Sequence, residues 1–143
     1  MTSLKSGVKL TLMKKLSLYI FLVLMWCNAG FAEWKVISMS TDGNTKTFMD
    51  YDTIIRQGDT VFFLMLTSYQ DGIDAEGYPT AYSDISRQEG NCKTNEVAVL
   101  SSKYYYKKMG KGNIILTDLP DPIEWHYFSP QSVLGIVLKY ACK

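Results

Sequence analysis

The sequence predicts an α+β domain, an antiparallel sheet of about six strands with one C-terminal helix packed on one face. Three observations support this class. Short apolar or alternating segments, separated by Gly, Asp and Asn turn residues, fill residues 34–117. From residue 133 onward, apolar residues recur at helical spacing. Cys142 ends that helix and Cys92 begins a strand region, so a disulfide can tie the helix to the sheet.

The N-terminal segment has the pattern of a secretory signal peptide. Met13-Lys14-Lys15 supplies a charged start, residues 16–26 an apolar run, and residues 28–32 small and polar residues. The apolar run is shorter than the roughly 20 residues that span a bilayer. We therefore predict a signal peptide at residues 1–32, with Met13 as an alternative start, and a single domain at residues 33–143. A retained membrane anchor is the alternative.

Cys27 gives the leader a second interpretation, as a lipidation site. Leu24 stands three residues before it, but Met25 and Trp26 occupy positions where a bacterial lipidation site has small residues. The pattern therefore favours a chain without lipid. We expect contact with a membrane only if Cys27 is lipidated.

Removal of the leader changes the charge of the chain. The 143-residue sequence has a formal charge of +1, but residues 33–143 hold 14 acidic and 11 basic residues and so carry −3. A net negative domain gives no general attraction to nucleic acid, so we expect no nucleic-acid partner.

The strands are predicted in chain order. Residues 34–39 and 45–49 form a hairpin around the turn signal Asp42-Gly43-Asn44. Residues 60–67 are apolar on both faces, which is typical of a central strand. An acidic loop is expected between residues 70 and 80. Further strands are predicted at residues 82–88, 96–106 and 113–117.

The C-terminal helix is predicted to begin at Ser129 and Pro130. Serine is a favourable N-cap and proline is well accommodated in the first turn. One apolar face then follows, made by Leu134, Val137, Leu138 and Ala141.

Cysteine and histidine content limits the other chemistry. After removal of the leader only Cys92 and Cys142 remain, and in an exported chain of this size they are expected to form one disulfide. Two free thiols, or half of a metal site, are the alternatives. A zinc site needs two more ligands and His126 is the only histidine, so we expect no metal.

The mature chain also resembles a known family, the surface-adhesin E family of exported bacterial proteins. The resemblance rests on the order of several short blocks together with the two cysteines. These blocks are Trp34, Asp50-Tyr51-Asp52-Thr53-Ile54, Tyr82-Ser83, Glu89-Gly90-Asn91-Cys92, Tyr104-Tyr105, Met109-Gly110-Lys111-Gly112, Trp125, Ser129-Pro130 and Tyr140-Ala141-Cys142. It implies a sheet with a disulfide-tied C-terminal helix, a surface adhesin that binds host matrix and plasma proteins, and homodimers in some members. It supplies no catalytic residues.

One segment is a candidate binding patch. Residues 103–111 place four lysines and three tyrosines in an otherwise acidic domain, so they can form a local positive surface for acidic glycans or proteins. The alternative is an edge strand and turn whose lysines deter aggregation. The candidate residues are Lys103, Tyr104, Tyr105, Tyr106, Lys107, Lys108 and Lys111.

No constellation supports catalysis or a cofactor. His126 lacks a convincing nucleophile and is expected to be partly buried and hydrogen-bonded. Three loose carboxylate groups, at residues 50–52, 71–76 and 118–121, are explained as solvated turns.

We therefore predict a non-enzymatic, adhesin-like binding domain without a cofactor. Its expected location is the periplasm or the outer-membrane surface of a Gram-negative bacterium, and its expected partners are host or extracellular proteins or glycans. The alternative is a periplasmic structural or envelope-stress protein with no host ligand.

Overall fold

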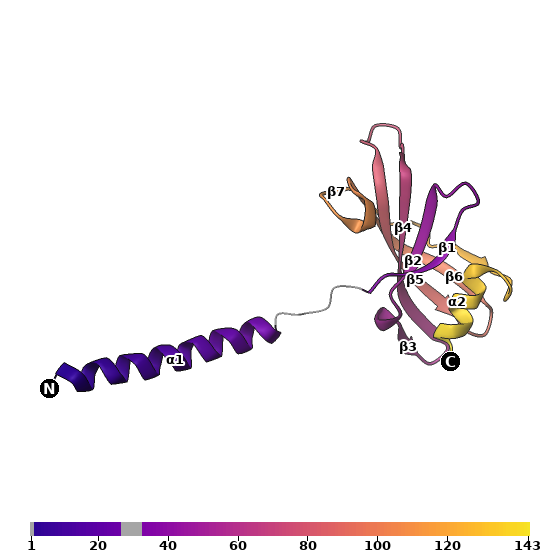
Figure 1. The fold of residues 1–143 in the computed structure, drawn as a ribbon. Helices are drawn as coiled ribbons and strands as arrows, with labels where there is room; N and C mark the ends of the chain where they lie inside the picture. Colours follow the sequence, from indigo (N-terminus) through magenta and orange to yellow (C-terminus); the bar gives the residue numbers. More distant parts are fainter. Residues whose placement is uncertain (1, 27–32) are drawn as a thin grey trace. The chain divides into compact units, whose positions relative to one another are not determined.

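A computed structural model describes residues 2–26 and 33–143. The chain divides into two units, Met1–Phe31 and Ala32–Lys143, which we describe separately. In the first unit, Thr2–Trp26 forms the helix α1 (Figure 1). Within the described part of the chain, no helix combines the length and apolarity needed to cross a membrane. Cys27 and the expected cleavage region lie outside the described residues.

The second unit contains one antiparallel sheet of eight strands. Its order is β1-β2-β4-β5-β6-β7, with β3 beside β4 and β8 beside β6. The strands and the C-terminal helix are β1 (Lys35–Met39), β2 (Thr45–Met49), β3 (Ile55–Gln57), β4 (Thr60–Ile73), β5 (Ala81–Asn91), β6 (Glu96–Tyr105), β7 (Ile114–Asp118), β8 (Trp125–Tyr127) and α2 (Val133–Ala141). Two short 3-10 helices, η1 (Tyr51–Thr53) and η2 (Lys108–Gly110), lie between strands.

The predicted fold class is therefore confirmed, and the strand count is larger than expected. The two additional strands, β3 and β8, have three residues each, and every residue in them is exposed. The expected loop at residues 70–80 is shorter, because β4 continues through Gly72 to Ile73 and pairs there with Ala81.

The predicted hairpin joins β1 to β2. The Asp42 carboxylate accepts hydrogen bonds from the Ser40 hydroxyl at 2.5 Å and from the Asn44 N–H at 3.0 Å. The Ser40 N–H donates to the Thr45 carbonyl at 2.8 Å. Gly43 has φ +73°, a conformation that glycine adopts without strain. The Asp-Gly-Asn turn thus fixes the register of the first two strands.

The long strands β4, β5 and β6 form the centre of the sheet, and their two faces differ. Side chains alternate between faces along a strand. On one face, Val61, Phe63 and Val97 are buried, and α2 packs against them; we call this the helix face. On the other face, Leu66 is fully buried and Ile85 is its cross-strand partner; we call this the turn face.

Helix α2 begins three residues later than the prediction from Ser129 and Pro130. Ser132 is the N-cap, and its hydroxyl oxygen accepts from the Gly135 N–H at 3.1 Å. The Ser129 carbonyl accepts from the Ser132 N–H at 2.9 Å, so residues 129–132 form a turn. A Cβ at Gly135 would lie 1.9 Å from that carbonyl oxygen. The chain folds back on the helix here, and the predicted start is wrong.

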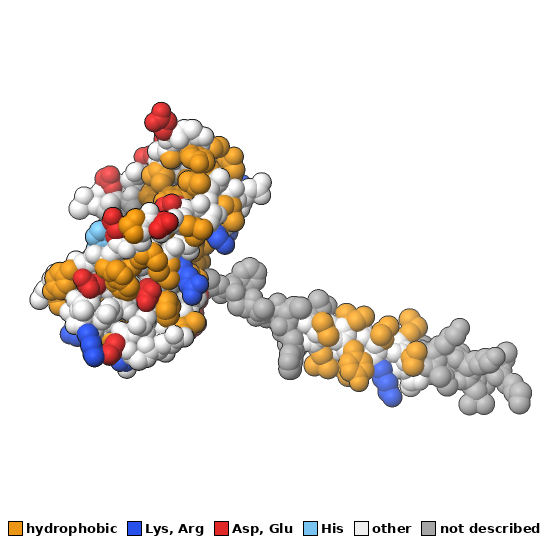
Figure 2. All heavy atoms as spheres, turned by 180° about the vertical axis from the view of Figure 1, so that it is seen from behind, with side chains coloured by type: hydrophobic (Ala, Val, Ile, Leu, Met, Phe, Trp, Pro, Cys, Tyr) orange, Lys and Arg blue, Asp and Glu red, His pale blue; other side chains and the backbone are white. Residues whose placement is uncertain are grey.

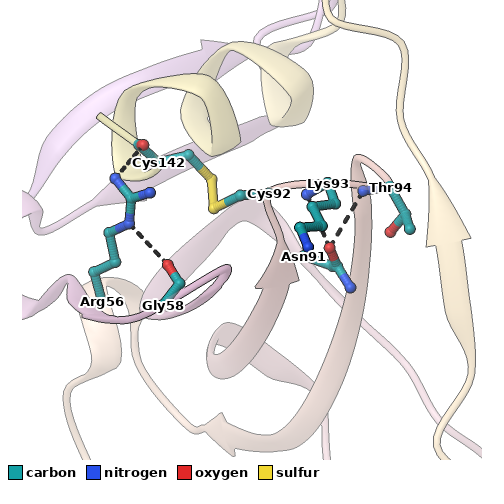
Figure 3. The surroundings of a disulfide bond; sticks show 7 residues. All are labelled: Arg56, Gly58, Asn91, Cys92, Lys93, Thr94 and Cys142. Carbon is teal, nitrogen blue, oxygen red and sulfur yellow. Dashed lines mark hydrogen bonds between the residues drawn. A yellow bond between two sulfur atoms is a disulfide. The ribbon is translucent and has the colours of Figure 1, made fainter.

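A disulfide fixes the end of α2 to the sheet. Cys142 is the C-cap residue of α2 and bonds to Cys92, immediately after β5, with the Cα atoms 5.7 Å apart. Figure 3 shows Arg56 beside this bond, where its guanidinium donates to the carbonyls of Gly58 and Cys142. The predicted disulfide is therefore present, and the region around β3 is hydrogen-bonded to the C-terminus.

Candidate binding surface

The predicted binding patch spans the end of β6, the turn through η2 and the start of the next loop. Within β6, Lys103 and Tyr105 lie on the turn face, because they pair with Ile85 and Ser83. Tyr104 pairs with Asp84 and lies on the helix face. The three neighbours therefore do not share one surface, and the tyrosines of the segment are divided between two faces.

Ser83 holds the turn after β6 against the sheet. Its hydroxyl donates to the Lys107 carbonyl and accepts from the Gly110 N–H at 2.9 Å. Met109 and Gly110 both have left-handed φ angles, +61° and +67°. As a result η2 folds over the turn face, where a Cβ at Gly110 would come 2.7 Å from Ile85 Cδ1.

Lys103 lies on the turn face, and the turn that folds over this face carries Lys107, Lys108 and Lys111. Lys103, Lys107 and Lys111 are exposed, and Lys108 is half-buried with its ammonium donating to Gln70 Oε1 at 2.7 Å. Lys46 of β2 joins them, since it shares a row on the turn face with Ser68 and Ser83. We define the basic surface as these five lysines: Lys46, Lys103, Lys107, Lys108 and Lys111.

Lys46 was missed by sequence reasoning, because it lies more than 50 positions before the other lysines. Only the register across β2, β4 and β5 brings it into the same row.

In the described part of the chain, the ion pairs are Lys93 with Asp59 at 3.2 Å and His126 with Glu124 at 3.7 Å. Neither of these ion pairs involves a lysine of the basic surface.

On the helix face, Tyr104 lies next to a buried carboxyl group. The Tyr69 hydroxyl donates to Asp84 Oδ1 at 2.7 Å, and Asp84 is 8% exposed. Burial raises the pKa of Asp84, and the hydrogen bond from Tyr69 partly offsets that effect. Burial, and then the charges of Asp84 and Asp118, raise the pKa of Tyr104. Tyr104 therefore remains a neutral phenol in an electronegative environment.

The expectation for His126 is wrong. His126 lies on β8 with its side chain 65% exposed, so it is not partly buried, and its nearest charged partner is the exposed Glu124, 3.7 Å from Nε2. In the described residues no group of three or more His, Cys, Asp or Glu side chains is placed to hold a metal ion. The expectation of a solvated turn is wrong for Asp50, which is 4% exposed and caps η1 by accepting from the Asp52 N–H at 3.0 Å. Asp74, which is exposed, accepts from the Thr80 hydroxyl.

The geometry defines a disulfide-tied sheet-and-helix domain with a lysine-rich turn face. The family model for surface-adhesin protein E matches residues 34–143. The chain belongs to the surface-adhesin protein E family.

Solved structures give the same fold. Crystal form II of Haemophilus influenzae protein E is 18% identical, with a TM-score of 0.55 over 75% of this chain and 86% of that chain. A selenomethionine form of the H. influenzae protein has the same identity and TM-score over 75% and 84% of the two chains. Protein E from non-typeable H. influenzae gives a TM-score of 0.54 at 18% identity, over 75% and 74%. The comparison with curated proteins gives no match.

Proposed function

We propose that residues 33–143 form an exported, non-enzymatic binding domain that recognises extracellular proteins or acidic glycans through the basic surface. The observation that carries this proposal is the lysine content of the turn face. Lys46 of β2 and Lys103 of β6 lie on that face, and the turn that folds over it carries Lys107, Lys108 and Lys111. Membership of a surface-adhesin family supports a binding role. The alternative is a periplasmic structural or envelope-stress protein without a host ligand.

The proposed attraction is local. A domain of net charge −3 repels polyanions at long range, so the basic surface must act within a few ångströms of the partner. Such contacts are screened as ionic strength rises, because the Debye length falls to about 10 Å at 0.1 M. Binding to an acidic glycan is therefore expected to weaken steeply with salt.

Heparin, used as a defined acidic glycan, tests this proposal. The exported protein is compared with Lys107→Glu/Lys108→Glu, and with Lys35→Glu/Lys139→Glu, which makes the same charge change outside the basic surface. We expect the first variant to lose about tenfold in affinity at low salt, since each exposed pair contributes up to about 1 kcal/mol. The control should lose much less. Equal losses in both variants, or no loss in the first, would contradict the proposal.

Export itself is part of the proposal. We infer that residues 1–32 act as a signal peptide and are removed, whether translation begins at Met1 or Met13. N-terminal sequencing of the exported protein should then begin at Glu33. A chain that begins at Cys27 and carries acyl groups would establish the lipidated alternative instead.

A homodimer is a further part of the proposal. It is supported by an apolar groove of about 320 Å³ between the edge strand β1 and α2, lined by Val36, Ile37, Tyr51, Val133, Ile136, Val137 and Tyr140. Ile136 is 57% exposed there. Sedimentation equilibrium should show a dimer that Ile136→Lys dissociates. A wild-type protein that stays monomeric at high concentration would exclude it.

A further inference from the structure

A separate pocket opens where the hairpin between β4 and β5 meets β7. Its volume is about 180 Å³. Its lining is mainly apolar and consists of Ile73, Ala75, Tyr78, Pro79, Ala81, Tyr104, Ile115, Leu116 and Asp118. An apolar cavity of about 150 Å³ accepts a molecule the size of benzene. The pocket is therefore large enough for one long side chain.

The charge around this pocket is negative. Asp118, which is exposed, is the only charged residue in the lining, and Tyr104, also in the lining, pairs across the sheet with the buried Asp84. Two more carboxylates, Asp74 and Glu76, flank Ala75 at the hairpin tip. Figure 2 shows an acidic side chain at the tip of the hairpin, at the top of the domain, and hydrophobic side chains gathered below it.

The basic surface does not offset this charge at the pocket. Lys103 precedes Tyr104 in β6 and lies on the turn face, whereas Tyr104 lies on the helix face. Neither lysine nor arginine contributes to the lining. The pocket thus combines apolar walls, two tyrosine rings and a carboxylate at one point.

We propose that this pocket binds an arginine side chain of a partner protein. The aliphatic stem would occupy the apolar walls, as long basic side chains do when their charged heads stay near water. The guanidinium would pair with Asp118 and lie against Tyr78 or Tyr104, because aromatic rings attract cations on their faces. A planar guanidinium stacks on aromatic rings and can donate two parallel hydrogen bonds to one carboxylate, whereas a lysine ammonium does neither.

This inference deepens the proposed binding function and rests on it for the existence of a protein partner. It assigns the domain two sites of opposite preference. The basic surface meets acidic groups on the turn face, and the pocket takes one basic side chain near β7. Occupation of the pocket by an arginine would give a protein partner a fixed orientation that charge attraction alone does not supply.

The pocket is tested with a small probe on the exported, isotope-labelled protein. Nα-acetyl-arginine amide is titrated while amide and side-chain NMR signals of Tyr104, Leu116 and Asp118 are followed. Nα-acetyl-citrulline amide is the matched neutral probe, with nearly the same shape and no charge. We expect saturable shifts with the arginine probe and roughly tenfold weaker binding of the citrulline probe.

Two variants localise the effect. Asp118→Asn should remove most of the preference for the arginine probe over the citrulline probe, and Ala75→Phe, on the exposed hairpin, should block both probes by filling the pocket. Asp52→Asn makes the same charge change on η1 and should leave both affinities unchanged.

Several outcomes of the arginine and citrulline titrations would overturn the inference. They are equal affinities for the two probes, shifts that survive Ala75→Phe, and no shift of pocket signals at any reachable probe concentration. An apolar probe such as benzyl alcohol that bound as well as arginine would also overturn it, since the pocket would then be merely apolar. The heparin experiment changes only lysines of the basic surface, and the arginine titration follows only signals of the pocket. Failure of one proposal can therefore be distinguished from failure of the other.

Discussion

Gly90 of β5 lies directly under Leu138 of α2. A Cβ at position 90 would come 2.4 Å from Leu138 Cδ1 and 2.9 Å from Val61 Cγ2. Leu138 and Val61 are both almost completely buried. The missing side chain of Gly90 therefore allows the helix to approach the sheet closely enough to close the core.

Gly90→Ala is expected to destabilise the domain by about 1–3 kcal/mol, the usual range for overpacking a filled core. Urea unfolding measures the change. Leu138→Ala alone creates a cavity and should cost about 2–5 kcal/mol. Because the added methyl group would enter that cavity, the double variant should lose clearly less than the sum of the two single losses. Additive losses would show that residues 90 and 138 do not make this contact.

Loss of the disulfide should also be costly. Cys92 and Cys142 close a loop across a sequence separation of 50, and chain entropy assigns such a closure roughly 4 kcal/mol. Cys92→Ser/Cys142→Ser should therefore lower the thermal midpoint strongly, and reduction of the wild type should reproduce the shift. Mass spectrometry of unreduced exported protein should find no free thiol at either position. Two free thiols there would disprove the link.

Ser132→Ala should cost about 1 kcal/mol, the typical value for removing a serine N-cap. The Ser132 hydroxyl accepts from the Gly135 N–H and donates to the Ser129 carbonyl. Ser129→Ala is the matched control, because its hydroxyl bonds within the turn to Gln131. Denaturant unfolding should show the larger loss for Ser132→Ala. The reverse order would favour a helix that starts at Ser129.

Asp84 predicts a dependence of stability on pH. Its pKa is raised in the folded state by burial, so the folded protein binds this proton more tightly than the unfolded chain does. The resulting stabilisation is present below the unfolded pKa of 3.8 and is lost as the pH rises through the raised folded value.

Asp84→Asn removes this penalty while keeping an oxygen that can accept from Tyr69. The variant should therefore gain stability over the wild type as the pH rises from 3 to 7, as measured by unfolding at each pH. Asp118→Asn is the control, because Asp118 is exposed and its change in charge should have little effect on unfolding. A wild-type advantage that grows with pH would contradict the predicted sign.

Sequence patterns predicted the elements that local chemistry determines. The first hairpin follows from its Asp-Gly-Asn turn, and the central strand from an apolar run at residues 60–67. The strands β3 and β8 were missed, because three residues are too few to show the alternation of apolar and polar residues that marks a strand. The helix start was misplaced because Ser129 and Ser132 are both good caps, and only the fold decides which serine is used.

The binding surface was predicted only in part. The lysines of residues 103–111 were identified from their density, but strand alternation places Tyr104 on the other face and register adds Lys46. The exposure of His126 follows from an edge position on β8 that sequence alone did not show. The pocket near β7 combines residues from four strands and a hairpin, so no local pattern could indicate it.

The central proposal is that this domain is an exported binding module, and exposure on the outer surface of the cell separates it from the periplasmic alternative. The most direct test is to label intact cells with an antibody or digest them with a protease, before and after the outer membrane is opened. We expect the domain to be reached on intact cells. If it is reached only after the membrane is opened, the adhesin assignment fails and the periplasmic alternative holds.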